Sequence, residues 1–177
     1  MKVWPAEQYR SESEERMTAD RKIEGEAKKA AARAMKLLLF KPRTTRELED
    51  RLREEEFDED DIAAAVAYCR SFGYVNDARY AENYVVSMKE RKSHAMIRRE
   101  LEGKGLDSSL IEAAFDEVPF EESDLAYDLV RKKCGSPHHM EEKELRRTFN
   151  FLARKGISSG TIWGAIRRYQ NEAPFED

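Results

Sequence analysis

The chain has 177 residues, of which 38% are charged and 40% are hydrophobic, and its formal net charge is −4. This length and apolar content suit one or two folded domains and exclude a wholly disordered chain. The acidic balance argues against a protein held on nucleic acid by its overall charge alone.

The first 25 residues are polar and show no clean helical periodicity. We expect residues 1–25 to form a loosely held N-terminal tail. The tail lacks the apolar segment of a secretory signal, and no run of the chain approaches the roughly 18 apolar residues of a membrane span. We therefore expect a cytoplasmic protein without a membrane partner.

A first helix is predicted over residues 26–40, EAKKAAARAMKLLLF. Alanine, leucine and lysine favour helix, and Pro42 disfavours helix in the residue ahead of it. Either Thr44 or Thr45 is then suited to cap a second helix, RELEDRLREEE, in which a glutamate stands near the capping-box position.

The third helix is predicted around Ile62, Val66 and Cys69, whose steps of four and three fit one helical face. The run FDEDDI before it alternates carboxylates like a calcium loop but lacks the glycine and the distal glutamate of such a loop. We interpret these carboxylates as N-capping groups. Gly73 follows as the expected left-handed stop.

The stretch GYVNDARYAENYV, residues 73–85, joins this helix to the next one. Asn76 or Asp77 is suited to cap the new helix, in which we expect the tyrosines to pack in a core rather than stack on bases. The apolar and aromatic positions recur at steps of three and four: Tyr80, Ala81, Tyr84, Val85 and Met88.

Three further helices are indicated by their ends. Ser93 is suited to cap HAMIRRELEGKG, and Ser123 to cap ESDLAYDLVRKKCG, which should stop at Gly135. The helix in MEEKELRRTFNFLARKG has acids in its first turn and bases in its last, as the helix dipole favours. Its Thr148 stands where the earlier units have an apolar residue.

Three blocks of the chain repeat one apolar pattern: FDEDDIAAAV (57–66), LDSSLIEAAF (106–115) and ISSGTIWGAI (157–166). Their offsets are 49 and 51 residues, and a leucine stands five residues before each block. A period near fifty residues indicates internal triplication. Because one such unit buries little apolar surface alone, we expect neighbouring units to stack and share a core.

The predicted fold is all-α, with three tandem three-helix repeats that form an elongated, curved array. The repeats are assigned to residues 26–73, 74–118 and 119–171, and an acidic C-terminal tail to residues 172–177. Trp163 lies in the last repeat, where it is either partly buried against a neighbouring unit or an exposed contact.

Motifs of catalysis and metal binding are missing. The chain has no Gly-rich phosphate loop, no Gly-x-Ser-x-Gly and no His-Glu-x-x-His. Cys69 and Cys134 lack the spacing of a zinc site, so we interpret both as reduced thiols, and the His138–His139 pair has no ligand cluster around it. We expect neither an enzyme nor a cofactor.

Charge is unevenly distributed along the chain. Residues 47–61 hold ten acids and two arginines, a local −8, whereas residues 131–155 hold eight bases and three acids, a local +5. The molecule should therefore be electrically polar.

The order RAMKLLLFKPRTTRELEDRL, GYVNDARYAENYV and IRRELEGKGLDSSLIEAAF resembles the RecX family, bacterial regulators of the RecA recombinase. The middle stretch is the most specific, with its Gly-aromatic, Asp, aromatic-Ala and aromatic-Val pattern. The resemblance implies a monomeric three-repeat protein that binds RecA filaments on single-stranded DNA, lies in their helical groove, and suppresses ATP hydrolysis, strand exchange and co-protease activity. It places the protein in homologous recombination, DNA repair and the SOS response.

Joined with the charge pattern, the resemblance makes the exposed bases of the second and third repeats candidates for contact with RecA or with single- and double-stranded DNA. They are Arg91, Lys92, Arg98, Arg99, Arg131, Lys132, Lys133, Arg146, Arg147, Arg154, Lys155, Arg167 and Arg168. The alternative for each is a solvated helix face. Two alternative functions are a helical-repeat adaptor for another protein and a stand-alone nucleic-acid-binding module.

Overall fold

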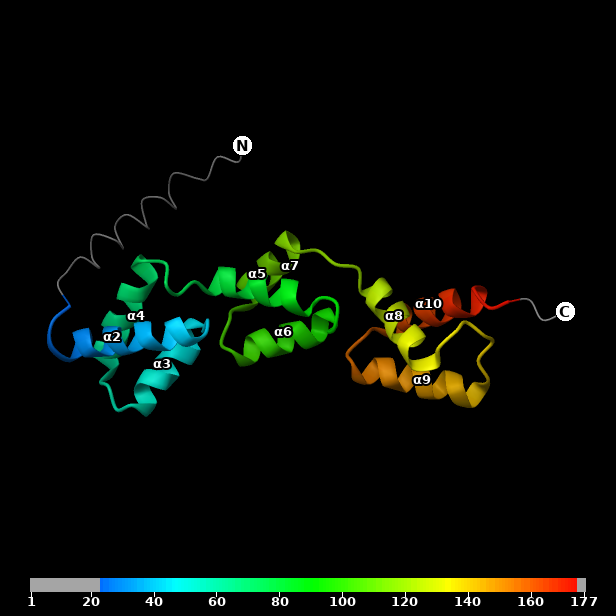
Figure 1. The fold of residues 1–177 in the computed structure, drawn as a ribbon, viewed down its shortest axis with the longest axis horizontal. Coiled ribbons are helices and arrows are strands. Elements are labelled where there is room, and N and C mark those ends of the chain that lie inside the picture. Colours follow the sequence, from blue (N-terminus) through cyan, green and yellow to red (C-terminus); the bar gives the residue numbers. More distant parts are fainter. Residues whose placement is uncertain (1–22, 175–177) are drawn as a thin grey trace, which may run out of the picture. The chain divides into compact units, whose positions relative to one another are not determined.

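The computed structural model describes residues 23–174, which form nine α-helices and no strand (Figure 1). The predicted all-α, three-repeat fold is therefore confirmed. Residues 1–22 and 175–177, which hold nearly all of the N-terminal tail and half of the C-terminal one, lie outside the described part. No helix within the described residues is long and apolar enough to cross a membrane.

The described chain divides into two compact units. One comprises residues 23–80 together with 104–106, and the other comprises residues 81–103 together with 107–174. The first repeat lies wholly in the first unit and the third repeat wholly in the second. The second repeat contributes segments to both.

The first repeat consists of α2 (Gly25–Phe40), α3 (Thr45–Glu54) and α4 (Glu59–Ser71). Thr44 caps α3, because its side chain accepts the Glu47 N–H while the Glu47 carboxylate accepts the Thr44 N–H. This reciprocal pair is the capping box expected there.

The acidic run before α4 does not cap that helix as predicted. Asp58 occupies the N-cap position, but its side chain makes no capping hydrogen bond. Three further acids instead lie in the first turn, where the partial positive charge of the helix N-terminus favours them: Glu59, Asp60 and Asp61. Gly73 ends the segment with φ of +69°, as expected for a left-handed stop.

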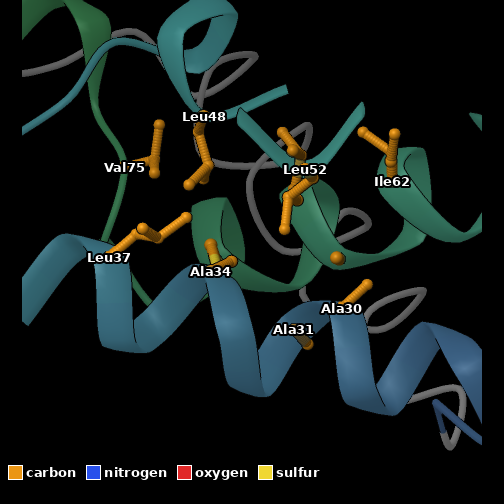
Figure 2. Close-up of a cluster of buried hydrophobic side chains, with 11 residues drawn as sticks. Ala30, Ala31, Ala34, Leu37, Leu48, Leu52, Ile62 and Val75 are labelled. Carbon is orange, nitrogen blue, oxygen red and sulfur yellow. The ribbon is translucent and has the colours of Figure 1, made fainter. Parts of the chain in front are cut away.

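The core of the first repeat lies between its three helices (Figure 2). Small side chains on α2 let the other two helices approach closely, and leucine and isoleucine fill the space between them. The labelled core residues are Ala30, Ala31, Ala34, Leu37, Leu48, Leu52, Ile62 and Val75. Burying each leucine or isoleucine contributes roughly 1.5–3 kcal/mol relative to leaving it in water.

Cys69 belongs to this core, and burial raises the pKa of its thiol to about 11. Cys134 is only partly buried, and its sulfur lies 3.4 Å from the Thr148 hydroxyl. We predict that a thiol reagent at pH 8 will modify Cys134 in the folded protein and Cys69 only after unfolding. Mass spectrometry of the labelled protein, with and without urea, measures this; rapid labelling of Cys69 in the folded state would contradict it.

The second repeat consists of α5 (Asp77–Met88), α6 (His94–Gly103) and α7 (Ser108–Glu117). Asn76 caps α5, because its side-chain oxygen accepts the Arg79 N–H at 2.9 Å. The helices bury the predicted apolar positions Ala81, Val85, Ile97, Leu101 and Ile111. The two tyrosines of α5 are only partly buried, and the Tyr84 hydroxyl donates to Glu100 at 2.6 Å.

The third repeat consists of α8 (Glu122–Cys134), α9 (Glu142–Arg154) and α10 (Ser159–Asn171). The prediction that Ser123 caps α8 is wrong, because Glu121 holds the N-cap position and Ser123 lies inside the first turn. Thr148 is fully buried, as its alignment with the apolar positions of the earlier repeats indicated.

The two clusters described lie mostly within single repeats, and the expected sharing of a core between neighbouring repeats is limited in them to Val75 of the second repeat. Apart from Val75, the first cluster draws on α2, α3 and α4. The second draws on α8, α9, α10 and their connections. Each of these two repeats therefore forms a core largely from its own three helices, and Leu39 of α2, which is 87% exposed, lies outside it.

His138 ties the α8–α9 connection to the third core. Its Nε2 lies 3.0 Å from the Glu144 carboxylate and its Nδ1 lies 3.0 Å from the Ser136 carbonyl, which also accepts the Tyr169 hydroxyl at 2.6 Å. The hydrogen bond to Glu144, followed by the one to Ser136, raises the pKa of His138. A doubly protonated ring is the form that donates to both acceptors.

This geometry predicts a pH-dependent contribution to stability. Because the pKa of His138 is higher in the folded than in the unfolded chain, where it is about 6.5, its contribution is fully present below the unfolded pKa. The contribution is lost as pH rises through the folded pKa. We expect the free energy of unfolding of His138→Gln to fall below that of the unchanged protein near pH 5.5 and to approach it at pH 9. Urea unfolding across this range tests it, and a difference that does not vary with pH would contradict it.

Candidate interaction surface

All thirteen predicted bases lie in the second unit, and the structure places them in three groups, of which the second and third share Arg147 and Arg154. Four are held in ion pairs within the unit: Lys92 with Glu100 (2.7 Å), Arg98 with Glu112, Arg131 with Glu172 (3.7 Å) and Arg168 with Asp124 (2.9 Å). The hydrogen bond to Glu100 raises the pKa of Lys92, and the one to Asp124 raises the pKa of Arg168. These side chains are charged, but their charge is largely compensated.

The second group gathers around an aromatic ring on α9. The ammonium groups of Lys133 and Lys155 lie 5.1 and 5.3 Å from the centroid of Phe151. Arg147 and Arg154 flank Phe151 at four residues before it and three after it, a spacing that puts all three on one side of the helix. We call these five residues the Phe151 face.

Lys133 and Arg147 also line a surface pocket of about 370 Å³. Its other lining residues are Cys134, Glu141, Lys143, Glu144 and Thr148. Three bases and two acids therefore share the rim of one hollow, which leaves it with an excess of positive charge. No cluster of three or more potential metal ligands occurs there or elsewhere in residues 23–174.

The third group consists of exposed bases that make no ion pair with any residue of the described chain. They are Arg91, Arg99, Lys132, Arg146, Arg147, Arg154 and Arg167. Four of the seven come from the third repeat's α8 and α9, and α10 adds Arg167. Their charges are uncompensated within residues 23–174, so an anionic group that approached this surface would be attracted to it.

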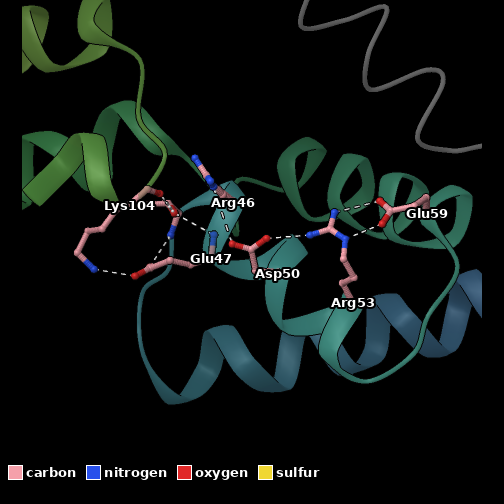
Figure 3. A network of polar contacts seen from close by, with 7 residues as sticks. Arg46, Glu47, Asp50, Arg53, Glu59 and Lys104 are labelled. Atoms are coloured by element: carbon pink, nitrogen blue, oxygen red, sulfur yellow. Dashed lines mark hydrogen bonds and ion pairs between the residues drawn. The ribbon is translucent and has the colours of Figure 1, made fainter.

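The acidic stretch of the first repeat is less negative than its sequence indicates. Lys104 approaches Glu47 at 2.6 Å, and Arg53 bridges Asp50 at 2.8 Å and Glu59 at 2.6 Å (Figure 3). Partial burial opposes the shift, but the hydrogen bonds from Lys104 and the Thr44 N–H lower the pKa of Glu47.

Arg33 from α2 completes this compensation by donating two hydrogen bonds of 2.6 Å to Glu55. Five acids of the stretch keep exposed or partly exposed carboxylates without an ion pair in the described chain. They are Glu49, Glu56, Asp58, Asp60 and Asp61.

Sequence reasoning missed the roles of Phe151 and Lys143. Phe151 is not singled out by the sequence analysis, although its spacing of four from Arg147 and three from Arg154 places it among bases. The ion pairs of Arg98 with Glu112 and of Arg168 with Asp124 were also not predicted, because the partners lie 14 and 44 residues away in the chain.

Each repeat matches one domain of a known family. The first, second and third three-helix domains of RecX match residues 30–69, 76–114 and 121–166. Each of these ranges covers most of one three-helix repeat of the structure.

Several relatives share this likeness over most of their length. The regulatory protein RecX of Amycolatopsis mediterranei is 36% identical over 149 residues, which covers 82% of this chain and 85% of that protein. The RecX of Streptomyces lividans is 33% identical, covering 81% and 78%. The crystal structure of RecX from Lactobacillus salivarius has a TM-score of 0.70 at 25% identity and covers 82% of this chain and 97% of its own. The chain described here therefore belongs to the RecX family of regulatory proteins.

Proposed function

We propose that this chain is a non-enzymatic regulator that binds RecA filaments on single-stranded DNA and inhibits their ATPase, strand-exchange and co-protease activities. The observation that carries the proposal is the match of all three repeats to RecX domains, together with relatives that are named regulatory proteins. The protein would act in the cytoplasm as a monomer and modulate recombination, DNA repair and the SOS response.

The uncompensated charges suggest which surfaces meet the filament. The Phe151 face and the seven exposed bases would lie toward acidic RecA surface or the DNA backbone. The unpaired acids of the first repeat would lie toward a basic patch. Because charges already paired within the fold gain little from a partner, Lys92, Arg98, Arg131 and Arg168 are weaker candidates than the rest.

Three repeats in series suit a polymer that presents its subunits at regular intervals. Binding along the helical groove of the filament would let one chain contact more than one RecA subunit. Simultaneous contacts of this kind raise the overall affinity without requiring any single contact to be strong.

Co-sedimentation with RecA on single-stranded DNA tests the proposal against its alternatives. The expected result is pelleting with the filament and not with DNA alone at physiological salt. Pelleting with DNA alone, weakening by about 0.7 log units per log unit of salt for each phosphate neutralised, would indicate the nucleic-acid-binding module instead. A chain that stays in the supernatant in both cases would point to an adaptor for another protein.

A further inference from the structure

The start of each of the first two middle helices contacts the following repeat through the same pair of hydrogen bonds. In the first case the Thr44 hydroxyl donates to the Lys104 carbonyl at 2.7 Å. The next residue, Thr45, donates its backbone N–H to the Asp77 carboxylate at 2.8 Å. All four residues belong to the first compact unit.

In the second case the Ser93 hydroxyl donates to the Lys155 carbonyl at 2.6 Å. The next residue, His94, donates its N–H to the Glu122 carboxylate at 3.0 Å. All four residues belong to the second unit. The two contacts have the same arrangement. The capping hydroxyl donates to the carbonyl just after the middle helix of the next repeat. The N–H of the following residue donates to the carboxylate of the first residue of that repeat's first helix.

Both hydroxyls use their donor and their acceptor at once. Thr44 also accepts the Glu47 N–H at 3.1 Å, and Ser93 accepts the Met96 N–H at 3.2 Å. Thr44 is 0% exposed and Ser93 is 1% exposed. A displacement of the following repeat would leave a buried hydroxyl without its acceptor, which is unfavourable. These bonds therefore fix the position of the following repeat.

A glycine follows each accepting carbonyl, and the preceding repeat leaves no room for a side chain there. Gly105 and Gly156 have φ of +84° and +77°. A Cβ on Gly105 would come within 2.2 Å of the Arg46 side chain, and one on Gly156 within 2.9 Å of the Ser93 hydroxyl. Gly73 and Gly135 also have positive φ, but a Cβ on either would meet nothing within 4 Å. Gly105 and Gly156 therefore have to be glycine for two reasons, the close approach of the preceding repeat and the left-handed backbone of the turn.

The first repeat carries a glutamate where the others have this glycine. Glu56 stands 49 residues before Gly105, the offset that also separates Thr44 from Ser93, and has a left-handed φ of 64°. A side chain in this conformation is unfavourable compared with glycine. At the opposite end, Glu141 and not a hydroxyl residue holds the N-cap position of α9. Two of the three parts of a further joint, the glycine and the hydroxyl, are thus replaced by exposed glutamates.

We propose that the hydroxyl, carboxylate and glycine form a recurring joint that docks each repeat on the one before, and that Glu56 and Glu141 close the two free ends against docking by a second copy of the chain. The glutamate at position 56 blocks the close approach sterically. The pair would also face each other as like charges if two copies met end to end, which opposes association.

The joint is tested by comparing Gly156→Glu with Gly135→Glu in the full chain. Both variants place a side chain at positive φ, but only the first collides with the preceding repeat. We expect hydrogen exchange at the His94 amide, measured by NMR, to quicken by about tenfold or more in Gly156→Glu and to stay unchanged in Gly135→Glu. Equal exchange in the two variants would overturn the joint.

A gentler pair keeps this test valid if Gly156→Glu fails to fold. Ser93→Ala removes a cap and the bond to Lys155, whereas Ser158→Ala removes only local bonds to Thr161, the capping bond from its N–H at 3.2 Å and the bond with its hydroxyl at 2.8 Å. Faster exchange at His94 in the first alone supports the joint. Unchanged exchange in both would overturn it.

Closure of the ends is tested by restoring the glycine and the hydroxyl as Glu56→Gly with Glu141→Ser. The control, Glu56→Gln with Glu141→Gln, removes the same two charges without restoring glycine or hydroxyl. Sedimentation velocity over a concentration series should show association only in the first variant. A rebuilt chain that sediments like the control would overturn the closing role of the glutamates.

Discussion

Replacing Ile162 by alanine should lower the free energy of unfolding by about 2–5 kcal/mol. The side chain is 0% exposed and lies in the cluster that α8, α9 and α10 form around Leu152 and Tyr169. Alanine would remove three carbon atoms and leave a cavity that the surrounding helices fill only partly. Because this repeat has its own core, the loss should appear as weaker urea resistance of the third repeat.

Trp163 provides the matched control one residue away. It is 44% exposed, and its ring contacts Phe149 at a centroid distance of 5.2 Å. Trp163→Ala should cost clearly less than Ile162→Ala despite removing a larger side chain, since much of that side chain is already in water. If urea unfolding shows a greater loss of unfolding free energy for Trp163→Ala than for Ile162→Ala, the assignment of Ile162 to the buried face of α10 and of Trp163 to its exposed face would be contradicted.

Reversing Arg146 and Arg147 to glutamate should raise the concentration needed to inhibit RecA by at least about tenfold, which corresponds to about 1.4 kcal/mol of binding energy. Both arginines are exposed on α9 and make no ion pair in residues 23–174. Arg147 also belongs to the Phe151 face. Glutamate favours helix about as well as arginine, so the circular dichroism spectrum should not change.

Lys28→Glu with Lys36→Glu is the control for net charge. Both lysines are exposed on α2, so the control changes the formal charge by the same amount in the first repeat. We expect it to leave inhibition nearly intact. If the control weakens inhibition as much as the arginine pair does, overall charge and not this surface governs binding.

Periodicity was sufficient to predict the architecture. The isoleucines at 62, 111 and 162 were expected in the core from their spacing alone, and none is more than 2% exposed. Local capping was predicted where the cap is local, as at Thr44 and Asn76. It failed at Ser123, because the preceding glutamates start the helix earlier and Glu122 reaches the His94 N–H, 28 residues away.

The sequence identified the bases of the candidate surface, but not which of them are paired with acids and which lie together. Sequence identifies charges, whereas the partner that compensates a charge depends on the tertiary fold. Arg98 and Arg99 are neighbours in the chain, yet Arg98 is paired with Glu112 and Arg99 is not paired within the described residues. The joints were not predicted either, because their hydrogen bonds join residues between 28 and 62 positions apart in the chain.

The most direct test is the rate of DNA-dependent ATP hydrolysis by RecA as this protein is added from far below to equal stoichiometry. We expect strong suppression. Suppression well below stoichiometry would indicate capping or propagated disassembly of filaments, and suppression only near equal amounts would indicate site-by-site blocking of the groove. An unchanged hydrolysis rate at every ratio would contradict the proposal that this chain regulates RecA.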